Sequence, residues 1–154
     1  MADAGPPTWM APGRARVSTF VACQNAEAVA EFARTVFGAT DVNPPLRRSD
    51  GSLWNAELEI GGSTVMVSEA PGDMARPAFL YVHVADVHDT FARALAAGAT
   101  EVMPPELRFY GDEDGGVADM AGNWWWIATH RETLSPDQVQ RAARQEEQRR
   151  ETQQ

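Results

Sequence analysis

The fold is decided by a stretch that occurs twice, as FARTVFGATDVNPP at residues 32–45 and as FARALAAGATEVMPP at residues 91–105. Both copies contain FAR, an apolar segment, GAT, an acid, a valine and Pro-Pro, and the second copy has one extra residue before its glycine. A period of about 60 residues is too long for a solenoid repeat. The duplication therefore predicts a domain built from two copies of one unit.

Each copy is expected to form the helix and the next strand of a β-α-β-β-β unit, because apolar residues recur at helical spacing inside the copy and alternate around it. In the first unit we expect a strand over 16–23, a helix from the N-cap Asn25 to Gly38, and strands over 39–42, 54–60 and 63–69. In the second unit we expect a strand over 79–84, a helix from Asp86 to Gly98, a strand over 100–103 that Pro104-Pro105 ends, a loop over 106–115, and a hairpin of 116–120 and 123–130.

These elements predict one domain over residues 14–132, with its two units at 14–70 and 77–132. Residues 1–13 contain proline and glycine without periodicity and are predicted to be a flexible tail. Residues 133–154 are predicted to be a polar C-terminal helix or tail, in which Ser135 is the N-cap and Pro136 the first helical residue.

Composition excludes several classes of function. The chain has 154 residues and a formal net charge of −9, from 22 acids and 13 bases that are all arginine. An acidic surface repels phosphate backbones, so we expect no nucleic-acid partner. The single cysteine, Cys23, allows no intramolecular disulfide and fits a reducing cytoplasm. We expect no signal peptide and no membrane partner, because no apolar run has the necessary length.

Three motifs resemble those of the vicinal oxygen chelate superfamily, which includes glyoxalases, bleomycin-resistance proteins and extradiol dioxygenases. They are Phe32-Ala33-Arg34-Thr35-Val36-Phe37-Gly38, Val84-Ala85-Asp86-Val87 and Asp119-Met120-Ala121-Gly122-Asn123. The segment from Phe109 to His130 is similar to the PhnB-like, glyoxalase-like branch. The resemblance implies an α+β fold in which two tandem βαβββ units form a curled mixed-sheet cup with helices outside, and it implies a homodimer.

The resemblance also implies where a metal ion would bind. The positions that carry the four ligands in metal-using members correspond to Ser18, Met66, Phe79 and Trp126. None of these side chains is a competent ligand for a hard or borderline dication, so we expect neither a metal nor another cofactor. A displaced site could use Glu57, His83 and His130. The simpler interpretation is that the two histidines are strand-end residues that hydrogen-bond to a loop or to solvent.

Strand alternation predicts which side chains face the cup. The expected ligand-binding residues are Phe20, Asn55, Glu57, Met66, Phe79, Tyr81, His83, Trp124 and Trp126, with Tyr110 and Arg108 on the long loop as a lid. Aromatic walls suit a planar or cationic ligand. The leading hypothesis is a metal-independent small-molecule-binding protein of the bleomycin-resistance type. The acids Asp112, Glu113 and Asp114 lack calcium-loop spacing and are interpreted as a solvated turn.

Other functions stay open at this point, and whether the chain is an enzyme is one of the open questions. The runner-up is a metal-dependent glyoxalase-like lyase or isomerase, or a dioxygenase. A third possibility is a metal-free acid–base enzyme with Glu57, Tyr81 or His83 as the base. If the tryptophans close the cup, the chain would instead be a structural or partner-binding protein.

Overall fold

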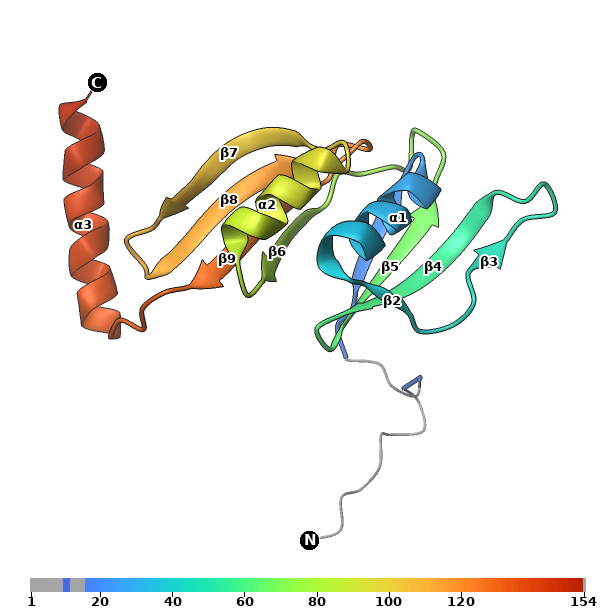
Figure 1. Ribbon diagram of the computed structural model, residues 1–154, viewed down its shortest axis with the longest axis horizontal. Coiled ribbons are helices and arrows are strands. Elements are labelled where there is room, and N and C mark those ends of the chain that lie inside the picture. Colours follow the sequence, from blue (N-terminus) through green and yellow to red (C-terminus); the bar gives the residue numbers. More distant parts are fainter. Residues whose placement is uncertain (1–9, 12–15, 154) are drawn as a thin grey trace, which may run out of the picture. The chain divides into compact units, whose positions relative to one another are not determined.

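The structure is a computed structural model that describes residues 10–11 and 16–153 (Figure 1). The chain divides into two units, residues 1–77 and residues 78–154. The tail predicted over residues 1–13 lies largely outside the described residues. Each unit has its own mixed sheet and a helix against one face, which is the expected α+β fold class. The curled cup involves both units and stays a prediction.

The first unit contains the expected βαβββ elements and one additional short strand. They are β1 (Thr19–Cys23), α1 (Ala26–Phe37), β2 (Thr40–Asp41), β3 (Leu46–Arg47), β4 (Leu53–Ile60) and β5 (Ser63–Glu69). The sheet order is β1-β5-β4-β2, with β3 also paired to β4, and β1 runs parallel to β5. Val21, Val67 and Leu58 share one face of the sheet and are buried, as are Val29 and Phe32 of α1, the helix that contacts β4 and β5. This apolar layer joins the sheet to its helix.

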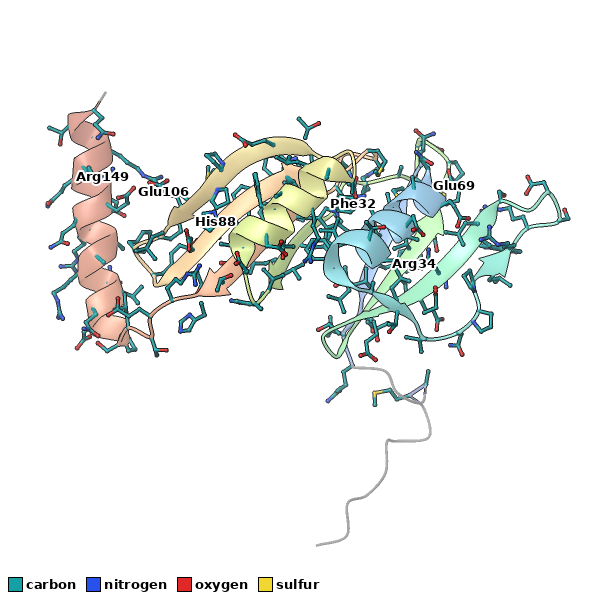
Figure 2. The ribbon with its side chains drawn as sticks, viewed as in Figure 1. Phe32, Arg34, Glu69, His88, Glu106 and Arg149 are labelled. Atoms are coloured by element: carbon teal, nitrogen blue, oxygen red, sulfur yellow. The ribbon has the colours of Figure 1, made fainter. Side chains whose placement is uncertain are left out.

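Asn25 is the N-cap residue of α1, as expected, but its side chain does not cap the helix. Asn25 has a left-handed backbone (φ 59°) and makes no side-chain cap hydrogen bond. Glu69 takes over this role, because the backbone N–H groups of Asn25 and Ala26 donate to its carboxylate at 3.1 and 2.7 Å (Figure 2). The parallel pairing of Cys23 with Glu69 brings this carboxylate to the positive end of the helix.

The second unit repeats the arrangement with longer strands. Its elements are β6 (Phe79–His83), α2 (Val87–Ala96), β7 (Thr100–Leu107), β8 (Asp112–Ala118), β9 (Trp124–His130) and α3 (Pro136–Thr152). The sheet order is β6-β9-β8-β7, and β6 runs parallel to β9. Asp86 caps α2 as predicted, since its carboxylate accepts the backbone N–H of His88 and of Asp89. Figure 1 shows α2 across one face of this sheet.

The expected end of β7 at Pro104-Pro105 and the expected loop over 106–115 are both wrong. The strand continues through both prolines to Leu107, and β8 already begins at Asp112. Proline is tolerated here because β7 is an edge strand whose pairing to β8 shifts register on both sides of Met103. The shorter loop has a direct consequence for function, because it places Asp112 and Asp114 inside the sheet.

The C-terminal helix α3 begins as predicted. The Ser135 hydroxyl oxygen accepts the backbone N–H of Gln138, and the side-chain oxygen of Gln138 accepts the backbone N–H of Ser135. The two residues therefore form a capping box. None of the described residues of α3 is buried. Within the described ranges, no helix combines the length and the apolar character needed to cross a membrane.

Candidate functional site

The candidate site is the face of the second sheet that carries aromatic, acidic and histidine side chains together. Alternation along three neighbouring strands puts the following residues on this face: Phe79, Tyr81 and His83 of β6, Trp124, Trp126, Ala128 and His130 of β9, and Asp112, Asp114 and Gly116 of β8. The intervening residues Leu80, Val117, Trp125 and Ile127 lie on the opposite face of the sheet and are buried. We call the first set the acidic–aromatic face.

One end of the acidic–aromatic face is a cluster of three rings. The Phe79 ring is stacked on Trp126 at 5.2 Å between centroids and 26° between planes. Trp124 lies 5.9 Å from Phe79 and 6.1 Å from Trp126. Phe79 is 60% exposed and Trp124 is 42% exposed. These rings therefore offer stacking surface that the described chain leaves open.

Glycine at position 116 gives Trp126 the room to lie flat across the sheet. Gly116 is the register partner of Trp126 on β8, and a Cβ atom built on it would overlap the indole ring. We expect Gly116→Ala to displace the indole and to lower the free energy of unfolding by about 1–3 kcal/mol, as overpacked sites do. Chemical denaturation followed by circular dichroism measures this loss. Ala118→Gly in the same strand is the control. Gly122→Ala is unsuitable as a control, because Gly122 has a positive φ at which alanine is strained.

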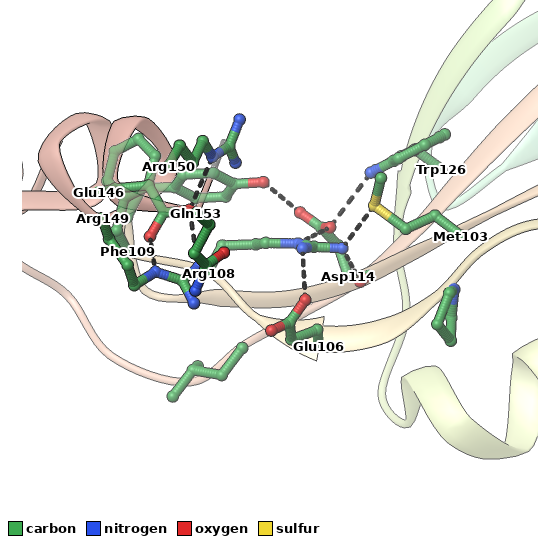
Figure 3. Close-up of a pocket in the computed structure, with 13 residues that line it drawn as sticks. Met103, Glu106, Arg108, Phe109, Asp114, Trp126, Glu146, Arg149, Arg150 and Gln153 are labelled. Atoms are coloured by element: carbon green, nitrogen blue, oxygen red, sulfur yellow. Dashed lines mark hydrogen bonds and ion pairs between the residues drawn. The ribbon is translucent and has the colours of Figure 1, made fainter.

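The centre of the face is the buried carboxylate of Asp114, which has no exposed side-chain surface. Its Oδ1 accepts the indole N–H of Trp126 at 3.1 Å and the Nε–H of Arg108 at 2.8 Å (Figure 3). Its Oδ2 accepts the hydroxyl of Tyr110, and the Tyr81 hydroxyl lies 3.2 Å away. Asp114 thus holds the indole, the guanidinium and the phenol in fixed positions.

The other end of the face is organised by Asp112. His130 Nδ1 lies 2.7 Å from its Oδ1, while His83 Nε2 and the Tyr81 hydroxyl lie 3.1 and 2.9 Å from its Oδ2. Burial by itself raises the pKa of Asp112, but the hydrogen bonds from His130, Tyr81 and His83 outweigh it and hold the pKa below its usual value. The carboxylate is therefore ionised at neutral pH and accepts from both imidazoles.

Both tyrosines of the chain belong to this network, and burial raises the pKa of each. Hydrogen bonding to a carboxylate adds to the effect, from Asp112 on Tyr81 and from Asp114 on Tyr110, and the pKa of Tyr110 reaches about 12. The phenols are thus kept neutral in the folded chain.

A spectrophotometric titration can test this, because no other tyrosine contributes. The folded protein is expected to show no tyrosinate near pH 10, whereas the urea-unfolded chain titrates there. Because the folded pKa is the higher one, the stabilisation is complete below about pH 10 and is lost as pH rises toward 12. Tyrosinate absorbance that rises at the same pH in both states would contradict the network.

The comparisons with known proteins agree with this architecture. The sequence model of the glyoxalase-like domain matches residues 18–128. The chain belongs to this glyoxalase-like family. Uncharacterized proteins of Mycobacterium bovis and Mycobacterium tuberculosis are 34% identical over 105 residues, which are 60% of this chain and 69% and 62% of the respective relatives.

Solved structures share the fold of the glyoxalase-like chain. TioX from Micromonospora sp. ML1 is 26% identical with a TM-score of 0.62, over 75% of this chain and 98% of TioX. A glyoxalase-related enzyme from Fulvimarina pelagi is 20% identical with a TM-score of 0.58, over 75% of this chain and 88% of the enzyme. The second likeness shows the fold alone.

The predicted ligand-binding residues of this glyoxalase-like chain divide between the two units. Phe79, Tyr81, His83, Tyr110, Trp124 and Trp126 come together in the second unit, on or beside the acidic–aromatic face. Phe20, Asn55, Glu57 and Met66 come together in the first unit, where Met66 pairs with both Phe20 and Glu57. There the side chains of Ser68 and Asn43 donate to Asn55 and Glu57, respectively.

Two acids at the centre of the site were missed by sequence reasoning. The interpretation of Asp112, Glu113 and Asp114 as a solvated turn is wrong, because all three lie in β8 and the two aspartates are buried. Glu113 points the other way, toward His88 of α2 at 2.6 Å. The guanidinium of Arg108 is held by Asp114, and a lid role for Arg108 and Tyr110 stays a prediction. The alternation Asp112-x-Asp114-x-Gly116 could have indicated a strand. It was overlooked because aspartate and glycine are typical turn residues.

The metal ion of the family does not fit the residues present. Neither the hydroxyl of Ser18, the thioether of Met66, nor the rings of Phe79 and Trp126 offer suitable donors. Across residues 10–11 and 16–153, no group of three or more His, Cys, Asp or Glu side chains could hold a metal ion. In the displaced site considered above, His83 and His130 instead face Asp112, and Glu57 belongs to the first unit.

A groove of about 530 Å³ adjoins the acidic–aromatic face on the side of β7 and α3 (Figure 3). Arg108, Tyr110 and Trp126 line one side, and Glu146 and Arg149 of α3 line the other. The charges on the helix are paired with each other, since Glu146 lies 2.9 Å from Arg149. The groove therefore extends the aromatic surface, and its Glu146 and Arg149 side chains neutralise each other.

Proposed function

We propose that this glyoxalase-like chain binds a planar, cationic small molecule on its acidic–aromatic face without a metal ion, as a protein of the bleomycin-resistance type. The observation that carries the proposal is the cluster of Phe79, Trp124 and Trp126, in which the Trp126 indole is hydrogen-bonded to the buried carboxylate of Asp114. Aromatic rings attract flat ligands by stacking and cations through the negative face of the π system.

Rigidity of the aromatic cluster supports a binding role. The Trp126 indole is fixed by its hydrogen bond to Asp114 and by stacking on Phe79. A surface that is already ordered loses little side-chain entropy when a ligand arrives. The net charge of −9 favours the approach of a cation and opposes that of an anion. Phe20, Asn55, Glu57 and Met66 stay predicted ligand contacts, and a homodimer stays a prediction for analytical ultracentrifugation.

Isothermal titration calorimetry with proflavine, a planar cation, tests the proposal. We expect binding by the native chain, and about two- to tenfold weaker binding by Phe79→Ala and by Trp124→Ala, since each ring contact contributes ~0.5–1.5 kcal/mol. Trp54→Ala is the matched control, because Trp54 is an exposed indole of the first unit. Acridine-9-carboxylate, a planar anion, is expected to bind more weakly. The proposal fails if a folded protein binds neither probe or if the control variant weakens binding equally.

A metal-dependent lyase, isomerase or dioxygenase is the alternative that membership of the family supports. It requires stoichiometric metal in protein purified without chelators, held by residues other than Ser18, Met66, Phe79 and Trp126. Elemental analysis of the purified chain separates it from metal-independent binding.

A further inference from the structure

We propose that the acidic–aromatic face is also a proton-abstracting site, in which His83 Nδ1 is the base and the substrate is a planar carbon acid. This inference rests on the proposed function, because the substrate must first stack on the exposed rings. His83 continues the row of β6 side chains that begins with Phe79 and Tyr81. Its ring lies 5.3 Å from the Tyr81 ring, so a flat molecule on Tyr81 reaches the imidazole.

The hydrogen bond to Asp112 selects the tautomer of His83. An ionised carboxylate only accepts hydrogen bonds, so the neutral imidazole must carry its proton on Nε2, which lies 3.1 Å from Asp112 Oδ2. The lone pair then belongs to Nδ1. The side chain of His83 is 61% exposed, and no described residue forms a hydrogen bond with this nitrogen. The free basic atom is therefore available to a molecule on the face.

The other two histidines differ from His83 in ways that single it out. His130 uses both ring nitrogens, since Nδ1 contacts Asp112 at 2.7 Å and Nε2 contacts the Thr133 hydroxyl at 2.8 Å. His88 is paired with Glu113 at 2.6 Å but lies on α2, away from the aromatic cluster. His130 thus helps to position Asp112, and His88 provides a matched control of the same residue type and pairing.

The reaction step balances without any further reactant. The C–H proton of the substrate moves to His83 Nδ1, and the C–H electron pair either stays on the substrate as an enolate or expels a leaving group. The resulting imidazolium is stabilised by the Asp112 carboxylate, which Tyr81 and His130 hold in place. Neutral or cationic substrates fit this face, because the aspartates oppose an anion before reaction.

Ring opening of 5-nitrobenzisoxazole tests the base directly. A base removes the proton on C3 of this planar probe, the N–O bond breaks, and coloured 2-cyano-4-nitrophenolate is released. We expect the native chain to exceed free imidazole at equal concentration, and His83→Ala and His83→Gln to lose about 100-fold in rate. His88→Ala should match the native chain. Asp112→Asn, which changes a positioning residue, should lower kcat and leave KM unchanged.

Two outcomes would overturn the proposal. One is a native rate no higher than that of free imidazole, and the other is a rate that His83→Ala leaves intact or that His88→Ala lowers equally. Proflavine titration of the same variants separates this failure from failure of the proposed function. If proflavine binds normally while the reaction does not depend on His83, the binding function stands and the base assignment falls. If the reaction depends on His83 but proflavine does not bind, the binding proposal is the one that falls.

Discussion

Asp114→Ala is expected to lower the free energy of unfolding by about 3–5 kcal/mol, the range found when one partner of a buried ion pair is removed. The side chain is fully buried and accepts from Arg108, Trp126 and Tyr110. Without it, the Arg108 guanidinium loses its buried carboxylate partner and keeps Glu106 as its ion-pair partner, and the indole and phenol lose their acceptor. The binding surface should loosen together with the fold.

Urea unfolding followed by circular dichroism measures this effect, and proflavine titration measures its cost to binding. Glu113→Ala is the matched control, because the neighbouring acid lies on the same strand but pairs with His88 and Arg131 at the surface. We expect a much smaller loss there, since such pairs are screened by water. Equal losses for the two variants would show that Asp114 is not the centre of the network.

The second large effect is expected at the turn between β8 and β9. Asp119 is 6% exposed, and its carboxylate accepts the backbone N–H groups of Ala121 and Asn123 and the indole N–H of Trp125. The side-chain amide of Asn123 donates to it as well. Asp119→Ala leaves several buried donors unpaired at about 1–3 kcal/mol each, so we expect a loss of about 3 kcal/mol or more.

Thermal unfolding and the chemical shift of the Trp125 indole N–H together measure this loss. Asp119→Asn should be less harmful, because it keeps one carbonyl oxygen for the two backbone N–H groups of the turn. Asp137→Ala, an exposed acid in the first turn of α3, is the control and should leave the Trp125 signal in place. An unchanged indole signal in Asp119→Ala would contradict the assigned network.

Sequence patterns predicted those parts of the fold that depend on local spacing. The repeated FAR and GAT segments gave both helices their correct positions, and Gly38 ends α1 with the expected left-handed backbone. Alternation correctly placed Phe79 and Trp124 on the face of the sheet opposite to the buried Trp125. The capping role of Asp86 was also readable, because an N-cap side chain bonds to residues only two and three positions away.

Features that depend on distant partners could not be read in this way. Glu69 caps α1 but lies 43 residues after Ala26, so the sequence around Asn25 gives no indication of this contact. Pro104 and Pro105 normally end a strand, but the edge position of β7 removes the need for their missing N–H groups. Asp112 and Asp114 are residue types common in turns. Their burial is explained by partners from other segments, such as His83 of β6 for Asp112 and Arg108 for Asp114.

The strand order has a consequence for how the chain can form its structure during synthesis. The last strand of each unit, β5 or β9, is an inner strand that pairs with the first strand of that unit. Until the ribosome has released residue 69, β1 has no partner, and until it has released residue 130, neither does β6. The pairing of the first strand of each sheet with the last is therefore a late step that depends on long-range contacts. A nascent chain that stops inside β9 would present β6 and β8 as two unpaired edges to other chains.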